Sequence, residues 1–168
     1  KYPEVDGIPI LINEDNSIFS LNTFINRTST TLPVSKKGSF SNFKSKLLPK
    51  IGKNIKAEKN YKNFLKMLID NSATRNVLVI GGEATGNGME CLINSKEVEL
   101  TEGDVSFGSR TMIIFDGHDI PFQNKTFDGV IIQAVLEHVV DPYRCVEEIH
   151  RILKDNGIVY SETPFMQQ

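Results

Sequence analysis

The feature that most constrains the fold is an alternation of short apolar runs with helical segments. The predicted strands cover residues 76–80, 98–101, 112–115, 129–133 and 158–160, most of them largely apolar, and helical patterns cover residues 86–94 and 142–153. Parallel strands read as continuous apolar runs because helical crossovers cover both faces of their sheet. We therefore predict an α/β fold with a parallel sheet and helices on both of its faces.

The last helix has clear boundary signals. Pro142 suits the first helical position, and one face is lined by apolar residues, namely Val146, Ile149, Ile152 and Leu153. The triplet Asp155-Asn156-Gly157 is typical of a helix end, so we expect the fifth strand to begin at Ile158.

The first third of the chain differs from the rest. We predict a turn-rich lead and basic linker over residues 1–53, with an Asp6-Gly7 turn and one or two short strands within residues 8–12. An amphipathic helix over residues 55–70 follows. We expect this helix to act as a lid, and to begin a core domain that covers residues 54–168.

Charge is distributed unevenly along the chain. Residues 36–66, here called the lysine-rich segment, hold ten lysines and one acid, whereas residues 71–168 hold fifteen acids and seven Lys or Arg. Such a segment binds nucleic acid, touches an acidic membrane surface or substrate, or is a solvated linker and helix face. We expect the solvated form, with no nucleic-acid or membrane partner.

Cysteine usage and hydropathy suggest a compartment. Cys91 and Cys145 lie far apart and form no zinc-type cluster, so we predict free thiols, no metal site and a cytoplasmic location. No apolar run has the roughly 18 residues that a membrane span needs.

The stretch VLVIGGEATGNG, residues 77–88, predicts a ligand loop after the first core strand. Glycines there accept positive φ and leave room for a ligand, and the next helix offers free N–H groups. Asp104 lies about 20 residues further on, the spacing expected of an acid that holds a ribose, with Glu102 as its competitor. The glycine spacing fits the G-x-G-x-x-G pattern of a nicotinamide-dependent oxidoreductase poorly.

The run DGHDIPFQNKTFDGVIIQAVLEHVVDPYRCVEEIHRILKDNGIVYSETPF, residues 116–165, resembles class I S-adenosylmethionine-dependent methyltransferases of the small-molecule type. The resemblance covers about residues 76–165. It implies a Rossmann-like fold, S-adenosyl-L-methionine as cofactor and a small-molecule methyl acceptor. It further implies that the cofactor is bound by Gly81, Gly82, Gly86, Asp104, Asp116, Gly117, His118, Gln133 and Ala134.

The sequence also departs from that family's pattern. Val79 stands where the first strand commonly has an acid, and the loop is one residue longer, with Glu83 inside it. The family's final antiparallel hairpin would follow the fifth strand, and we expect it to be missing from a chain truncated after Gln168. These departures favour an alternative, a non-catalytic cofactor-binding module, and they predict self-association through an exposed sheet edge.

His138, in LEHVVDP, is the candidate catalytic residue. An imidazole near the transferred methyl group could act as a base, whereas a structural histidine would pack the loop and bind a backbone carbonyl. Glu137 has the same two interpretations, and His118 lies beside the adenine or faces solvent. His150 is expected on the helix surface. Methyl transfer needs alignment and exclusion of water more than a catalytic triad.

Overall fold

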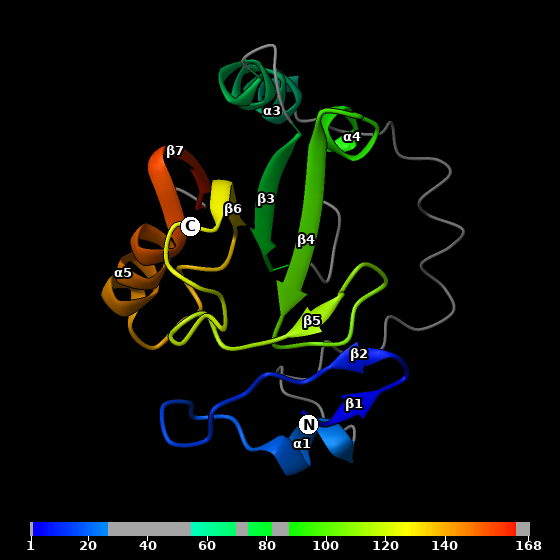
Figure 1. The fold of residues 1–168 in the computed structure, drawn as a ribbon, viewed down its shortest axis with the longest axis vertical. Coiled ribbons are helices and arrows are strands. Elements are labelled where there is room, and N and C mark those ends of the chain that lie inside the picture. The colour runs from blue at the N-terminus through cyan, green and yellow to red at the C-terminus, as the bar shows by residue number, and fades with distance from the viewer. Residues whose placement is uncertain (1, 27–54, 70–73, 82–87, 164–168) are drawn as a thin grey trace, which may run out of the picture.

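The core of the protein is a five-stranded parallel sheet, seen in a computed structural model that describes residues 2–26, 55–69, 74–81 and 88–163 (Figure 1). Its strand order is β5-β4-β3-β6-β7. The strands are β3 (Arg75–Ile80), β4 (Val98–Asp104), β5 (Ile113–Ile114), β6 (Phe127–Gln133) and β7 (Leu153–Glu162). All four pairings are parallel, so the predicted Rossmann-like sheet is confirmed.

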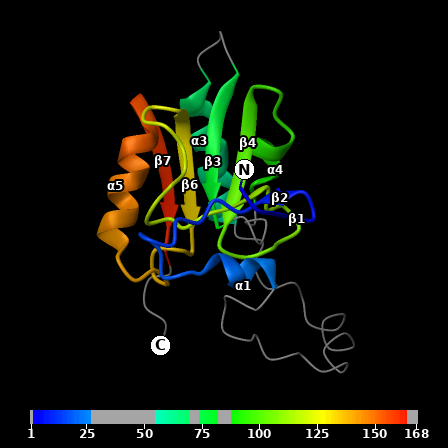
Figure 2. The ribbon, with the colours of Figure 1, turned by 60° about the horizontal axis from the view of Figure 1, so that its bottom comes forward.

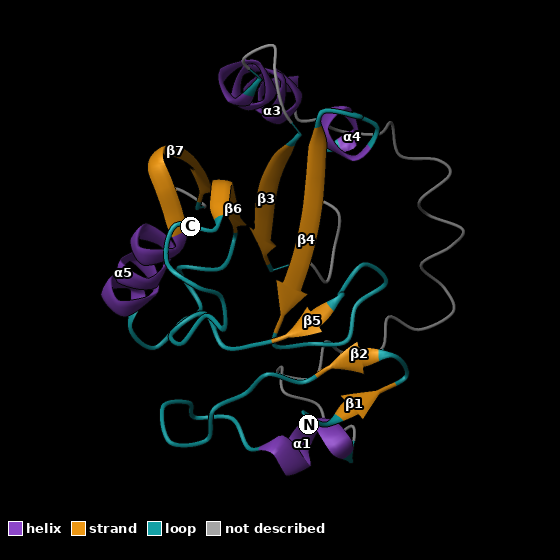
Figure 3. Ribbon diagram, in the orientation of Figure 1, coloured by secondary structure: helices purple, strands orange, loops and turns teal. Residues whose placement is uncertain are grey.

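Helices cover both faces of this sheet, as Figures 2 and 3 show. Helices α3 (Ile55–Leu68) and α4 (Glu90–Ile93) pack on the face that carries Val77 and Val79. Helix α5 (Pro142–Ile152) packs on the opposite face, which carries Leu78 and Ile80. Successive side chains of a strand point to opposite faces, so the unbroken apolar run of β3 serves both cores.

Helix α5 begins where the sequence predicts. The Asp141 carboxylate accepts hydrogen bonds from the backbone N–H groups of Tyr143 and Arg144 at 3.1 Å, and Pro142 needs no such acceptor. The predicted end of the helix is close, because α5 ends at Ile152.

The start of the fifth strand differs from the prediction. Strand β7 begins at Leu153, directly after α5, and the expected turn triplet lies inside the strand. Leu153 pairs with Phe127 and Ile158 pairs with Gly129, so the intervening residues form a bulge. Asn156 adopts φ +64° within it. The triplet favours a left-handed conformation, which a bulge uses as well as a helix end does.

The N-terminal lead is built onto the edge of the sheet. Strands β1 (Glu4–Val5) and β2 (Ile8–Pro9) form a hairpin whose turn residues, Asp6 and Gly7, both have positive φ. Ile10 then forms a parallel bridge with Ile114, and Leu11 N–H donates to the Ile114 carbonyl at 2.8 Å. The lead is therefore continuous with β5.

A short helix, α1 (Leu21–Ile25), was not predicted, because five residues give too short a periodic pattern. Its Phe24 is buried with Ile10, Ile12 and Ile114 in a small core of its own. The predicted boundary at residue 53 lies outside the described residues, as does most of the lysine-rich segment.

The described part of the lysine-rich segment is α3. Its four lysines, Lys56, Lys59, Lys62 and Lys66, are all exposed. Lys62 pairs with Glu58 one turn earlier at 2.7 Å. Exposed lysines are compatible with each of the three alternatives for this segment, so the solvated form stays a prediction. Among the described residues no helix is long and apolar enough to cross a membrane.

Candidate cofactor site

A cavity of about 530 Å³ opens at the carboxyl ends of β3, β4, β5 and β6. The strand order changes direction between β3 and β6, and open α/β sheets bind ligands at such a switch point. The volume lies within the roughly 300–1,000 Å³ of typical ligand sites. Eight predicted site residues line this cavity: Gly81, Asp104, Asp116, Gly117, His118, Gln133, Ala134 and His138.

Asp104 is the last residue of β4, and its carboxylate lines the cavity. One carboxylate oxygen accepts a hydrogen bond from Ser106 N–H at 2.9 Å, which orients the group at the strand end. Its competitor Glu102 is 3% exposed and is not part of the cavity wall. Arg110 binds Glu102 through both its Nε, at 2.9 Å, and a terminal nitrogen. The structure thus separates an acid on the cavity wall, Asp104, from an acid that is buried against Arg110, Glu102.

Asp116 follows β5 and forms a compact polar cluster with His118. Oδ1 of Asp116 accepts hydrogen bonds from His118 N–H at 2.9 Å and from Nδ1 of the His118 ring at 2.6 Å. The ring's Nε2 accepts a hydrogen bond from Asp141 N–H at 3.1 Å, so the proton of the neutral imidazole lies on Nδ1. His118 therefore faces the protein with both nitrogens and links two loops of the site.

The second oxygen of Asp116 is held from the N-terminal lead. Ser17 Oγ donates to Oδ2 at 2.5 Å. Burial by itself would raise the pKa of Asp116, but the hydrogen bonds from Ser17 and His118 outweigh it and keep the pKa below its ordinary value. Asp116 is thus a charged, acceptor-only group on the cavity wall.

Gly81 shows why a glycine follows β3. Its φ is +90°, and a Cβ there would lie 2.5 Å from a methyl carbon of Val135. A side chain would therefore be strained in its backbone and would clash with the loop after β6. Gly82 and Gly86, the other predicted glycines, lie outside the described residues.

Gln133 and Ala134 end β6 at the other side of the cavity. Tyr61 of α3 donates its hydroxyl hydrogen bond to Gln133 Oε1 at 2.7 Å, and Gln133 Nε2 donates to Glu162 at 3.4 Å. Burial raises the pKa of Tyr61, which keeps the hydroxyl protonated as a donor. Ala134 has φ +52° and donates its N–H to the Glu162 carbonyl at 2.8 Å. A left-handed alanine is a strained conformation of the kind that clusters at ligand sites.

His138 is exposed and lines the cavity. Its backbone N–H closes a turn with Val135, while the part of the chain that the structure describes gives its imidazole no hydrogen bond. The hydrogen bond to a backbone carbonyl that the structural interpretation includes is therefore not seen among the described residues, and the catalytic role of His138 stays a prediction. His150 is exposed on α5, as predicted. Cys145 is buried against the cavity, and burial raises its pKa to about 11, so it is a neutral thiol.

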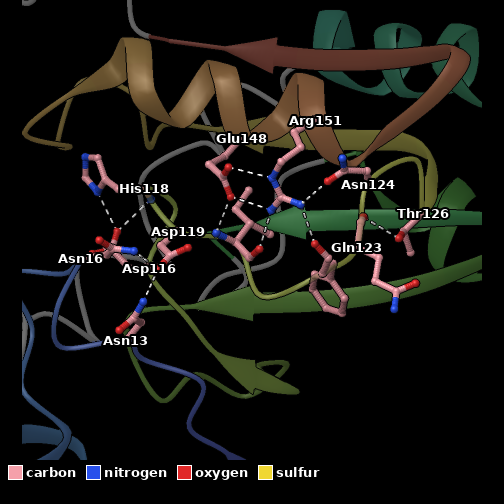
Figure 4. A network of polar contacts seen from close by, with 12 residues as sticks. Asn13, Asn16, Asp116, His118, Asp119, Gln123, Asn124, Thr126, Glu148 and Arg151 are labelled. Carbon is pink, nitrogen blue, oxygen red and sulfur yellow. Dashed lines mark hydrogen bonds and ion pairs between the residues drawn. The ribbon is translucent and has the colours of Figure 1, made fainter.

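Arg151 and Glu148 of α5 fix the loop that carries Asp116 and His118 (Figure 4). The Arg151 guanidinium donates to the backbone carbonyls of Ile120 and Phe122, each at 2.7 Å, and to Glu148. Glu148 in turn accepts a hydrogen bond from Ile120 N–H at 2.8 Å. Both partners of the pair thus bind loop backbone, which holds the carboxyl end of β5 in place.

Several cavity residues were missed by the sequence reasoning, namely Ile18, Phe19, Tyr61, Met89, Val105 and Val140. Tyr61 lies on the apolar face of the predicted amphipathic helix, but helical periodicity does not indicate which residue of another element Tyr61 contacts. Ile18 and Phe19 belong to the lead, and no motif in their stretch of sequence indicates a site.

The fold is a doubly wound α/β sheet with a cavity at the switch point of its strand order. The family model described as "Methyltransferase domain" matches residues 88–161, which include Asp104, Asp116 and His138. Over these residues, a little under half of the chain, the sequence is similar to methyltransferase domains.

Solved structures of other proteins have a similar fold. A protein assigned as a methyltransferase of this type from Methanococcus maripaludis has 19% identity and a TM-score of 0.50, over 62% of this chain and 54% of that one. One assigned as a sarcosine dimethylglycine methyltransferase from Galdieria sulphuraria has 15% identity and a TM-score of 0.52, over 64% and 45%. An uncharacterized protein of Methanocaldococcus jannaschii is 41% identical over 46 residues, which are 27% of this chain and 22% of that protein. The chain spans about half the length of these two solved structures.

Proposed function

We propose that the protein binds S-adenosylmethionine in this cavity and transfers its methyl group to a small-molecule acceptor. The observation that carries the proposal is the convergence of two carboxylates, Asp104 and Asp116, with Gly81 in one cavity at the switch point of the sheet. The family match to residues 88–161 supports the reaction class. The small-molecule acceptor rests on the resemblance of the sequence to that type of methyltransferase.

The donors and acceptors of the cavity fit a nucleoside. A carboxylate only accepts hydrogen bonds, and both ribose hydroxyls and an adenine amino group donate them. Asp104 at the end of β4 would hold the ribose hydroxyls, and Asp116 after β5 would accept from the amino group. Gly81 leaves the backbone open to close approach. Gln133 and Ala134 would face the methionine part.

When bound, S-adenosylmethionine supplies a sulfonium methyl group that is already activated toward nucleophiles. The chain then has to align an acceptor with that group and exclude water. Apolar residues such as Ile80, Phe115 and Ile132 line the cavity and make it poor in competing water. His138 would accept the proton that an O or N nucleophile loses, since its exposed imidazole faces the cavity.

One observation favours the alternative, a non-catalytic cofactor-binding module. Val79 stands where the family commonly has an acid, and its side chain is 5% exposed, packed in the core at the cavity wall. An aliphatic side chain there offers no hydrogen bond to the amino group of a methionine. The residues after β6 would then have to bind the methionine end of the cofactor.

Two measurements separate these functions. Calorimetric titration with S-adenosylmethionine tests binding, and an assay for S-adenosylhomocysteine over a panel of O, N and C acceptors tests turnover. Binding with turnover of one acceptor supports the methyltransferase, and binding without turnover of any acceptor supports the module. Tight binding of NADH in place of S-adenosylmethionine would contradict both.

A further inference from the structure

The N-terminal lead crosses the open end of the cavity. Residues 13–19, here called the strap, leave the edge of β5 and place Ile18 and Phe19 in the cavity wall. Ile18 is 72% exposed although it lines the cavity, so it lies at the rim. Phe19 is anchored behind the strap by an edge contact with Phe24, at a ring centroid distance of 6.1 Å.

Side-chain hydrogen bonds tie the strap to the loop after β5. Asn13 Nδ2 and Asn16 Nδ2 both donate to Asp119 Oδ2, at 2.9 and 3.0 Å (Figure 4). Ser17 Oγ donates to Asp116 Oδ2 at 2.5 Å. Three consecutive attachments within five residues fix the strap against the loop, although the two segments are about a hundred residues apart in sequence.

These contacts leave few free hydrogen-bond acceptor positions on the Asp116 carboxylate. A carboxylate has about four acceptor positions, two on each oxygen. His118 fills Oδ1 with two hydrogen bonds, and Ser17 occupies one position of Oδ2. Oδ2 therefore keeps one position for a ligand, which suits a single N–H of an amino group. Ser17 sets the direction in which that position points.

We propose that the strap is the outer wall of the nucleoside end of the cofactor site, and that Ser17 is its positioning residue. Ser17 fixes the Asp116 carboxylate so that Oδ2 meets the amino group, and Ile18 and Phe19 cover the base. The inference rests on the proposed function. It also extends the site to a segment far outside the family-matched residues 88–161.

The direct test measures the affinity of S-adenosylmethionine and of adenosine by calorimetry, for the unaltered chain and for Ser17→Ala. The affinity for both ligands should fall about tenfold in the variant, the scale of one lost hydrogen bond to a charged group. Ser17→Thr keeps the hydroxyl and should restore binding. Ser20→Ala is the matched control, because Ser20 caps α1 in the same lead without contacting Asp116, and it should bind as the unaltered chain does.

Two further variants distinguish positioning from general loss of structure. In an Asp116→Ala background, Ser17→Ala should have no additional effect on affinity, because the acceptor of the Ser17 hydroxyl is gone. Asp119→Ala removes both asparagine attachments but no cavity residue, and it should weaken adenosine binding by releasing the strap. A thermal melt of each variant reports whether the fold is kept.

These measurements distinguish a failure of the proposed function from a failure of the inference about the strap. If the unaltered chain binds neither S-adenosylmethionine nor adenosine, the proposed function is wrong and the inference falls with it. If the unaltered chain binds and the folded Ser17→Ala variant binds equally well or more tightly, the inference alone is overturned. An equal loss in Ser20→Ala would also overturn it, since the loss would then reflect the stability of the whole lead.

Discussion

Replacing Asp104 by alanine is the sharpest perturbation of the proposed cofactor site. The carboxylate ends β4, lines the cavity and is oriented by Ser106 N–H at 2.9 Å. A ribose offers it two hydroxyl donors, and hydrogen bonds to charged groups contribute about 1.5–3 kcal/mol each. The two contributions are not fully additive, because water competes for the same groups. We therefore expect the binding free energy to weaken by about 2 kcal/mol or more, which is roughly a thirtyfold rise in Kd.

Calorimetric titration of S-adenosylmethionine into the folded variant measures this loss. Asp104→Asn keeps one acceptor oxygen and should lose less than Asp104→Ala. Glu102→Gln is the matched control, because this acid lies two residues earlier on the same strand but binds Arg110 instead of facing the cavity. It should lower the melting temperature and leave the Kd unchanged.

An unchanged Kd in Asp104→Ala, with the melting transition intact, would refute the assignment of the ribose to the end of β4. A loss in Glu102→Gln instead would move the ribose contact to Glu102. It would also mean that the pair with Arg110 opens when ligand binds.

Four other predictions follow from single features of the structure. Gly103→Ala should lower the free energy of unfolding by about 3 kcal/mol or prevent folding, since its Cβ would overlap the Phe115 ring, and chemical denaturation would detect this. Burial would raise the pKa of Asp128, but hydrogen bonds led by that from Lys154 lower it, so its stabilising contribution should be present above about pH 5 and be lost as the pH falls through its folded pKa. Denaturation across that range should show a shallower decline for Asp128→Asn. We further expect β7, an edge strand of the described sheet, to mediate self-association in sedimentation experiments, and Val159→Lys, at a half-exposed position, to abolish it. RNA titrated at physiological salt should show no tight, salt-dependent binding to the lysine-rich segment, and a submicromolar complex would contradict this.

The sequence by itself was enough to predict the parallel sheet. Runs such as residues 77–80 and 130–132 are apolar without alternation, and that pattern is typical of strands buried on both faces. The spacing from the glycine loop also indicated Asp104, with Glu102 as its competitor, and the structure then showed that β4 runs on to Asp104. In a parallel sheet the carboxyl ends of the strands share one edge, so an acid that ends a strand lies at the ligand edge.

Local patterns were less informative where one residue type serves two conformations. Asp155-Asn156-Gly157 has the composition of a helix end, yet it forms a bulge within β7. The helix had already ended at Ile152, and pairing with β6 absorbed the extra residues. This pairing depends on the neighbouring strand, whose residues lie outside the stretch of sequence around the triplet, so the triplet alone does not predict the bulge.

Contacts between distant segments were decided by the tertiary structure alone. Tyr61 meets Gln133 and Ser17 meets Asp116 because α3 packs over one face of the sheet and the lead attaches to its β5 edge. Each of these residues is unremarkable in its own stretch of sequence, and a hydroxyl group fits many surroundings. Such a contact depends on how two packed elements are placed relative to each other. The burial of their apolar faces determines that placement, and the periodicity within either element does not predict it.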